Sequence, residues 1–423
     1  MKLLIRGGRV IDPVGGMDAQ MDILVENGKI SHMAANLDAP QAQVLNAAGL
    51  VVSAGLVDMH VHLRDPGLTH KETIPTGRAA AAAGGFSAVA CMPNTKPAAD
   101  SPETLRYILN TAKGPGPRVL PIGALTVGER GEELTDAQAL RAAGAVALSD
   151  DGMPVQSADV MRRGLMGAKD QGLKVLSHCE DGDMVKNYAV NEGAVSQALG
   201  IPGRPAIAEE LMVCRDAMLA QETASPVHIC HVSTAGSVEI IRRFKALGAP
   251  VTCETCPQYF SLTEEEVLKQ GTMARVNPPL RTQLDVAAII AGLRDGTIDA
   301  IAPDHAPHAK EEKAKPLTDA PSGMVGLETA LGVTLTYLYH TGKLSLPDIL
   351  RKMTAVPASI LRLPYGRLAV DEAADITIFD PDEEWTVEPE KFRSMGRNTP
   401  YAGRRLKGKV KYTIVDGQVV YRG

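Results

Sequence analysis

The chain has 423 residues, 44% of them hydrophobic, and can therefore bury a core large enough for one big domain with a smaller one beside it. Its 44 lysines and arginines are outnumbered by 50 aspartates and glutamates, and a net charge of −6 provides neither a basic surface for nucleic acid nor a polybasic patch for a membrane. Arg6 and two glycines break the first segment too early for a secretion signal, and no apolar run is long enough to span a bilayer, so we expect a cytoplasmic protein.

Both ends of the chain have the pattern of short β-strands joined by tight turns. Asn27-Gly28 separates two strand-like runs near the start, and Asp416-Gly417 does the same near the end. Both dipeptides are typical of β-hairpin turns. Because the two ends share this pattern, we predict that residues 1–54 and 365–423 together form one small β-sandwich domain.

The middle of the chain alternates short apolar runs with helix-like segments. The predicted strands lie at residues 87–92, 119–123, 145–148, 174–178, 227–231, 251–253 and 300–302. The predicted helices between them include residues 102–113, 208–221, 237–247 and 283–293. About eight such units predict a (β/α)8 barrel over residues 55–364, a fold in which the reacting groups sit at the carboxyl ends of the strands.

The segment from Asp58 to Gly67 follows another short strand-like run and has the strongest chemical pattern in the chain. In an extended strand alternate side chains point the same way, so His60 and His62 should face one direction. Two imidazoles at the end of a strand provide half of a metal site. Arg64 continues the same face and is suited to bind a substrate carboxylate.

Other polar residues follow the remaining predicted strands, where each strand should reach the mouth of the barrel. They are Asn94, Asp150, Asp151, His178, His231, Asp304 and His308. Imidazole and carboxylate ligands without a thiolate suit Zn²⁺ or a similar divalent ion.

The ligand types divide into two metal positions. One ion would take His60, His62 and Asp304, and a second would take His178 and His231. The carboxylate that bridges them would be Asp151, with Asp150 as the alternative. A hydroxide held between two such ions would be acidic enough to exist near neutral pH.

Motifs along nearly the whole chain are similar to those of the amidohydrolase superfamily and, within it, to the class I dihydroorotases of pyrimidine biosynthesis. They are Asp-x-His-x-His-Leu-Arg-Asp-Pro-Gly at 58–67, Met-Pro-Asn-Thr at 92–95, Ser-Asp-Asp-Gly at 149–152, His-Cys-Glu-Asp at 178–181, His-Val-Ser-Thr at 231–234, Val-Asn-Pro-Pro-Leu-Arg at 276–281 and Asp-His-Ala-Pro-His at 304–308. The Asp-x-His-x-His element is common to the superfamily, whereas Arg64 and the last two motifs are much narrower signals.

The resemblance implies roles for individual residues. The metal ligands would be His60, His62, Asp151, His178, His231 and Asp304. The substrate contacts would be His62, Arg64, Asn94, Asn277, His308, Ser322 and Gly323. Asp304 would also be the catalytic acid and base. The implied enzyme is a zinc-dependent cyclic amide hydrolase with one or two Zn²⁺ per chain, which interconverts N-carbamoyl-L-aspartate and (S)-dihydroorotate by means of a metal-bound hydroxide.

The resemblance further implies a homodimer and leaves an association with aspartate transcarbamoylase open. Two segments depart from the family pattern. Residues 253–260 are closer to hydantoinase-like relatives, and Ser322 stands where the family commonly has phenylalanine. Cys253 and Cys256 have the spacing of a redox or zinc motif, but no second pair follows to complete a four-thiolate site.

Two other functions remain open from the sequence. The first is a hydantoinase or allantoinase, against which Arg64 speaks because a hydantoin needs no carboxylate clamp. The second is a catalytically silent, dihydroorotase-like scaffold subunit for a transcarbamoylase. Such a subunit could lose metal ligands freely, whereas this chain offers a candidate for every one.

Overall fold

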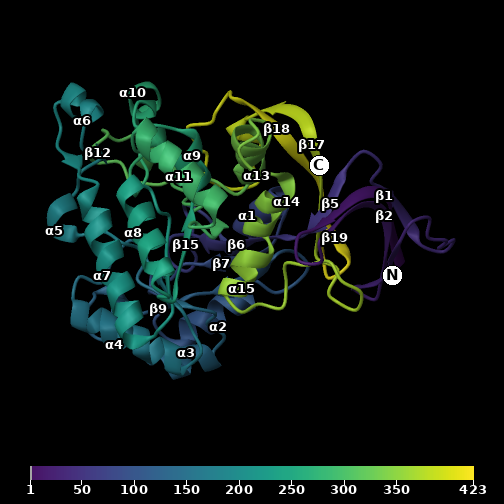
Figure 1. Cartoon of the computed structure of the whole chain (residues 1–423), viewed down its shortest axis with the longest axis horizontal. Helices are drawn as coiled ribbons and strands as arrows, with labels where there is room; N and C mark the ends of the chain where they lie inside the picture. Colours follow the sequence, from purple (N-terminus) through teal and green to yellow (C-terminus); the bar gives the residue numbers. More distant parts are fainter. Residues whose placement is uncertain (1) are drawn as a thin grey trace.

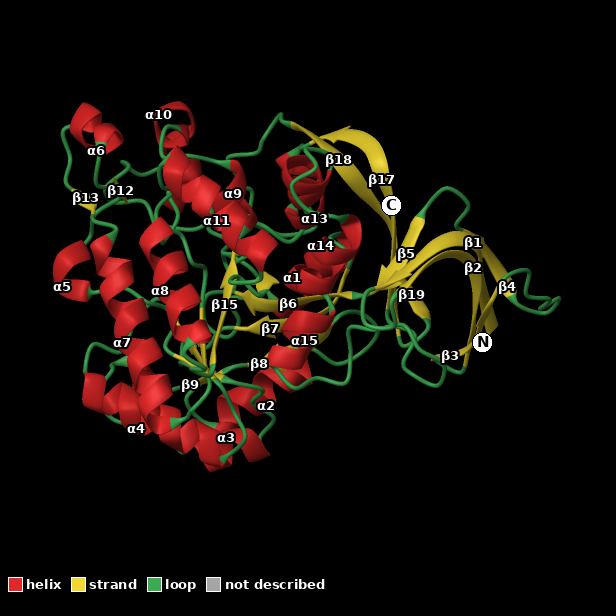
Figure 2. Ribbon diagram, in the orientation of Figure 1, coloured by secondary structure: helices red, strands yellow, loops and turns green. Residues whose placement is uncertain are grey.

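The protein was analysed as a computed structural model, which describes residues 2–423. Figures 1 and 2 show two parts, a barrel surrounded by helices and a β-sheet region beside it that contains both ends of the chain. The strands β17 and β18 extend from the sheet region over the barrel. The barrel carries the candidate site.

The barrel strands are parallel and lie in a three-stranded sheet, β6-β7-β8, and a six-stranded sheet, β16-β15-β14-β11-β10-β9. Their bounds are β6 Leu56–Val61, β7 Phe86–Cys91, β8 Arg118–Pro121, β9 Gly123–Ala124, β10 Leu148–Ser149, β11 Val175–Ser177, β14 Val227–Ile229, β15 Val251–Thr255 and β16 Ala300–Ile301. Only Ile122 separates β8 from β9, so the two form one interrupted strand. A bridge from Val61 to His305 closes the ring, which confirms the predicted (β/α)8 barrel.

The barrel strands are buried on both faces, because side chains of the barrel interior cover one face and helices cover the other. Every residue of β6 and β7 is buried, and neither strand shows the alternation of a half-exposed strand. A short continuous apolar run in the sequence is therefore sufficient to predict such a strand.

Serine and threonine residues begin several of the surrounding helices by accepting a hydrogen bond from the first turn, as Ser101, Ser157 and Thr234 do. The helices are α1 Ile74–Ala83, α2 Pro102–Thr111, α3 Ala137–Ala142, α4 Ala158–Asp170, α5 Gly182–Val185, α6 Ala194–Leu199, α7 Ile207–Thr223, α8 Ala235–Ala246, α9 Pro257–Ser261, α10 Glu266–Gln270, α11 Gln283–Asp295, α12 Lys310–Lys313, α13 Ala330–Thr334, α14 Leu346–Met353 and α15 Ala355–Ile360. Among residues 2–423 no helix combines the length and apolar character that crossing a membrane requires.

Some boundaries differ from those predicted. The strand expected at 145–148 is assigned as β10 at Leu148–Ser149, although Val146 N–H still donates to the Pro121 carbonyl at 3.0 Å, so the chain is already aligned with its neighbour. The two-stranded pair β12 (Val190–Asn191) and β13 (Gly203–Arg204), which lies between β11 and α7, was not predicted.

Strands from both ends of the chain form one eight-stranded sheet, ordered β19-β18-β17-β5-β1-β2-β3 with β4 paired to β1. Their bounds are β1 Lys2–Asp12, β2 Met17–Glu26, β3 Lys29–Ala34, β4 Gln43–Asn46, β5 Val51–Ala54, β17 Ile376–Thr386, β18 Arg405–Val415 and β19 Gln418–Arg422. The two ends meet where β5 pairs with β17. The domain boundaries at residues 54 and 365 stay a prediction.

This sheet separates two hydrophobic cores. Val51 and Phe379 belong to the core shared with the barrel, whereas their neighbours Val52 and Ile378 belong to a smaller core enclosed by the terminal strands. The alternation follows from the two-residue period of a strand. The sheet is therefore packed on both sides and fixed against the barrel.

Arg118, at the start of β8, connects the barrel to this sheet through ion pairs with Asp375 and Asp416. Arg118 is 19% exposed and Asp375 only 7%. We expect Arg118→Ala to lower the free energy of unfolding in urea by about 2 kcal/mol, since it leaves a nearly buried carboxylate without its cation. The control is Arg106→Ala, in an exposed pair with Glu103, which should cost under about 0.5 kcal/mol. Equal losses in the two variants would contradict this role of Arg118.

Candidate metal centre and active site

The residues predicted as metal ligands meet at the carboxyl ends of the barrel strands. His60 lies in β6 and His62 directly after it, and the other four follow the ends of four further strands: Asp151 after β10, His178 after β11, His231 after β14 and Asp304 after β16. All six are buried. The alternation of the strand turns His60 and His62 to the same side, as expected.

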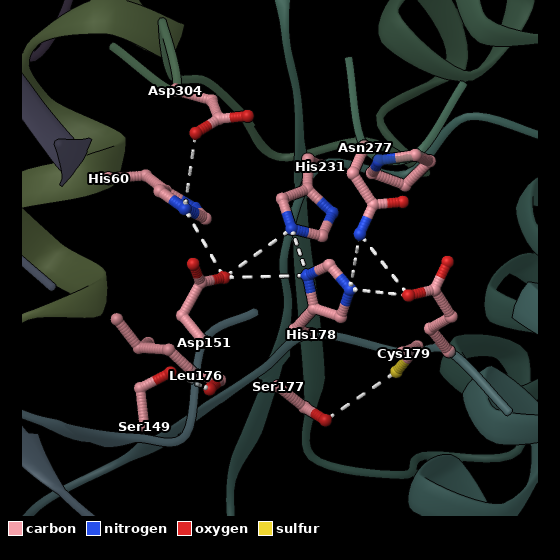
Figure 3. Close-up of polar contacts among 12 residues, drawn as sticks. His60, Ser149, Asp151, Leu176, Ser177, His178, Cys179, His231, Asn277 and Asp304 are labelled. Atoms are coloured by element: carbon pink, nitrogen blue, oxygen red, sulfur yellow. Dashed lines mark hydrogen bonds and ion pairs between the residues drawn. The ribbon is translucent and has the colours of Figure 1, made fainter. Parts of the chain in front are cut away.

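Asp151 lies between the imidazoles. Its Oδ1 is 3.4 Å from His60 Nε2, 3.6 Å from His178 Nδ1 and 3.5 Å from His231 Nε2. Its Oδ2 is 3.4 Å from His62 Nε2. Figure 3 shows the carboxylate of Asp151 facing His60 on one side and the pair of His178 and His231 on the other. One carboxylate thus contacts both halves of the cluster.

Asp304 lies on the His60 and His62 side of the cluster. Its Oδ1 is 3.2 Å from His62 Nε2 and 3.6 Å from His60 Nε2. Asp150, the alternative to Asp151, is turned away: it accepts hydrogen bonds from the backbone of Leu125 and Thr126, and burial raises its pKa to about 6.

The charge distribution of the cluster fits a divalent cation. His60 Nε2 and Asp151 Oδ1 are buried and have no hydrogen-bond partner among residues 2–423. His178 Nδ1 and His231 Nε2 face each other at 2.8 Å. Burial opposes a charged imidazole, yet the Asp151 carboxylate holds the pKa of His60 well above its ordinary value. A metal ion would supply the same positive charge to Asp151 and accept the imidazole lone pairs.

Cationic side chains border the Asp304 side of the cluster. The buried side chain of Arg64 makes one hydrogen bond within residues 2–423, from Nε to the Pro307 carbonyl at 3.3 Å, so both of its terminal amino groups are left for a ligand. Burial, together with the charges of Arg64, Lys71 and Lys313, lowers the pKa of His308 to about 2. His308 is therefore neutral, and this part of the site favours an anion.

Two predicted substrate contacts lie against metal-ligand candidates. Asn94 Oδ1 accepts from His62 Nδ1 at 2.8 Å and so fixes that ring. Asn277 Nδ2 lies 3.3 Å from His178 Nε2, and Figure 3 shows the amide beside that ring. Asn277 Nδ2 also donates to Glu180 at 3.2 Å, the carboxylate that faces His178 Nε2.

Ser322, Gly323 and His308 form one contact group. His308 Nε2 donates to the Ser322 carbonyl at 2.8 Å, whereas the Ser322 hydroxyl accepts from Arg275 at 3.3 Å and is not directed at His308. Gly323 has a φ of +133°, and a Cβ there would lie 3.0 Å from His308 Nε2. A larger residue at 323 would displace the imidazole.

Comparison with known proteins places this geometry in a family. A sequence model of the Dihydro-orotase-like family matches residues 49–237. The dihydroorotase of Pelotomaculum thermopropionicum is 52% identical over 420 residues, which are 99% of this chain and 98% of that one. The dihydroorotase of Citrifermentans bemidjiense is 50% identical over the full length of both chains. The chain belongs to the dihydroorotase family.

The fold of this dihydroorotase-family chain is shared with other cyclic amidohydrolases. The L-hydantoinase (dihydropyrimidinase) from Arthrobacter aurescens superposes with a TM-score of 0.89 at 26% identity and covers 99% of this chain and 96% of its own.

The acceptors behind the imidazoles were not predicted from the sequence. Glu254 on β15 lies 2.7 Å from His60 Nδ1, and Glu180 lies 3.4 Å from His178 Nε2. Arg204 donates to Glu180 at 2.5 Å and also contacts Asn277. The available signals were an acidic residue inside the short buried strand Val251–Thr255 and another inside the dihydroorotase-like motif at 178–181.

The thiols of Cys253 and Cys256 do not join the centre. Burial raises the pKa of Cys253 to about 12 and that of Cys256 well above its ordinary value, so both stay protonated. Neither belongs to a group of converging ligand atoms among residues 2–423. They are small buried side chains in the barrel core.

We expect His231→Asn to lower the divalent metal bound per chain by at least half, because it removes a nitrogen ligand from the His178 side of the cluster. The measurement is elemental analysis after dialysis. The control is His340→Asn, whose ring contacts the Pro381 carbonyl far from the barrel mouth. Unchanged metal content in His231→Asn would exclude this ring from the ligand set.

Proposed function

We propose that the chain is a dihydroorotase, which reversibly cyclises N-carbamoyl-L-aspartate to (S)-dihydroorotate and water in the de novo synthesis of pyrimidines. Full-length relatives named dihydroorotase at about half identity support this function. The observation that carries it is the buried Arg64 beside the histidine and aspartate cluster. Ring closure consumes one carboxylate of the substrate and leaves the other, which needs a cation to hold it.

Arg64 would hold that remaining carboxylate through its two free amino groups, a geometry in which a guanidinium can bind both oxygens. Asn94, Asn277, His308, Ser322 and Gly323 stay predicted contacts for the rest of the ring, as does His62. The positive charges around His308 would strengthen the same preference for an anionic substrate.

His60, His62, Asp151, His178, His231 and Asp304 would hold one or two Zn²⁺ ions. A bound divalent ion polarises a carbonyl and lowers the pKa of water. In the hydrolytic direction, water adds to the ring amide carbonyl and the bond to nitrogen breaks. Asp304 would take the proton from the water and deliver it to the departing nitrogen, and in ring closure it would do the reverse.

The oligomer and its partners stay predictions. A homodimer and an association with aspartate transcarbamoylase follow from the family resemblance alone, and the cytoplasmic location follows from the sequence pattern. Light scattering of the purified chain, with and without a transcarbamoylase, measures the oligomeric state and the association.

The substrate is tested by assaying dihydroorotate, hydantoin and allantoin side by side with the purified chain. We expect turnover of dihydroorotate, and a kcat/KM at least about 100-fold lower in Arg64→Met because a charge-assisted contact to the carboxylate is lost. Metal content should not change. Turnover of hydantoin or allantoin alone would identify the chain as a hydantoinase or allantoinase. A purified chain that turns over none of the three substrates and contains no bound metal would be the catalytically silent scaffold subunit.

Asp304 is tested by Asp304→Asn, which keeps the shape of the side chain but cannot carry a proton. We expect ring opening and ring closure to fall together by about 10²–10⁴-fold. Bound metal should fall less than in His60→Asn, since the amide retains a ligand oxygen. Both directions and the metal are measured on one preparation, and survival of either direction near the parent rate would refute a single proton carrier.

A further inference from the structure

His60 has a different partner on each side of its ring. Nε2 faces the cluster, 3.4 Å from Asp151 and 3.6 Å from Asp304. Nδ1 faces away from it, 2.7 Å from Glu254 Oε1. The side chains of His60 and Glu254 are each only 1% exposed, so water does not compete for this contact. The contact joins β6 to β15 inside the barrel, past the intervening strand β16.

Glu254 is held in turn by His228, a buried histidine on the neighbouring strand β14. His228 Nε2 lies 3.4 Å from Glu254 Oε2, and His228 Nδ1 lies 2.9 Å from Thr252 Oγ1. His228 Nε2 and Glu254 Oε2 are both buried and neither forms a hydrogen bond among residues 2–423, so each is the nearest polar atom available to the other. Lys174 completes the series by donating to Thr252 Oγ1 at 3.2 Å.

One set of proton positions gives each member of the series a complementary neighbour. Lys174 donates to Thr252. The Thr252 hydroxyl then donates to His228 Nδ1 at 2.9 Å in preference to the Val227 carbonyl at 3.4 Å, which leaves the proton of His228 on Nε2, 3.4 Å from one oxygen of Glu254. The other oxygen accepts from His60 Nδ1–H, which leaves the lone pair of His60 on Nε2, the nitrogen that faces Asp151 and Asp304. A carboxylate at this depth would be costly to bury without such donors.

We propose that Glu254 and His228 are positioning residues for His60, which fix its tautomer and ring orientation so that Nε2 is presented to the metal. This inference rests on the proposed role of His60 as a metal ligand. Neither residue touches the reacting atoms.

A metal ion between His60, Glu254 and Cys230 is the competing interpretation, because one ligand atom of each lies within 4.8 Å of the others. The short contact between His60 Nδ1 and Glu254 already occupies both atoms. The positioning role accounts for His60 and Glu254 without a further ion, and Cys230 is a small buried side chain near them.

The test measures Zn²⁺ affinity by competition with a chromophoric chelator, alongside the thermal unfolding midpoint of the metal-free chain. We expect Glu254→Gln to weaken Zn²⁺ binding by about 10–100-fold with a near-parental midpoint. His228→Gln should weaken it less, and the double variant should be no weaker than Glu254→Gln, because His228 acts only through Glu254. The control is Glu266→Gln, which loses a buried carboxylate paired with Arg404 outside the barrel mouth and should bind Zn²⁺ like the parent.

Each outcome decides the matter. Parental Zn²⁺ affinity in Glu254→Gln would overturn the proposal, and so would additive losses in the double variant. Should Glu254→Gln fail to fold, His228→Gln alone decides, because parental affinity there would refute a role for the pair. A parent chain that binds no Zn²⁺ would contradict the metal centre itself, and an active, zinc-bound parent with unaffected variants would contradict only the positioning role.

Discussion

Asp151 is buried among four imidazole rings, and the rest of the site depends on how the negative charge of this carboxylate is balanced. One carboxylate oxygen faces three of the rings and the other faces the fourth. Parallel strands make such an arrangement accessible, since their carboxyl ends converge on a single rim and each can deliver one side chain to it. The arrangement becomes stable when positive charge occupies the centre, which is the physical case for a cation there.

Three of these rings use their two nitrogens in the same way. His60, His62 and His178 each turn one nitrogen toward Asp151 and the other toward an oxygen acceptor, respectively Glu254, Asn94 and Glu180. A ring held from behind cannot rotate or change tautomer freely, so the inner nitrogens are set before any ligand arrives. The imidazoles therefore lie between two sets of oxygen atoms. The carboxylate of Asp151 is on the inside, and the carboxylate or amide oxygens of Glu254, Asn94 and Glu180 are on the outside.

The barrel and its rim residues could be predicted because each motif directly follows a short apolar run, and a strand end is a local property of the sequence. Asp304 and Asp151 are examples, since position in the chain alone places them at the rim. Glu254 could not be found this way, because its contact with His60 depends on how side chains of β15 and β6, which β16 separates in the ring, meet inside the barrel. The bonding of Asn94 to His62 was missed for a related reason: a resemblance suggests which residues gather at a site but not which neighbour each side chain selects.

The pairing of β5 with β17 has a consequence for how the protein is made. About 320 residues of chain separate these two strands, so at a synthesis rate of roughly 5–20 residues per second β5 waits tens of seconds for its neighbour. During that interval β5 presents an open strand edge, which is a surface prone to adventitious pairing. β1 is already covered on both sides, by β2 on one and by β4 and β5 on the other, so the edge left open until the last strands leave the ribosome is the short edge of β5.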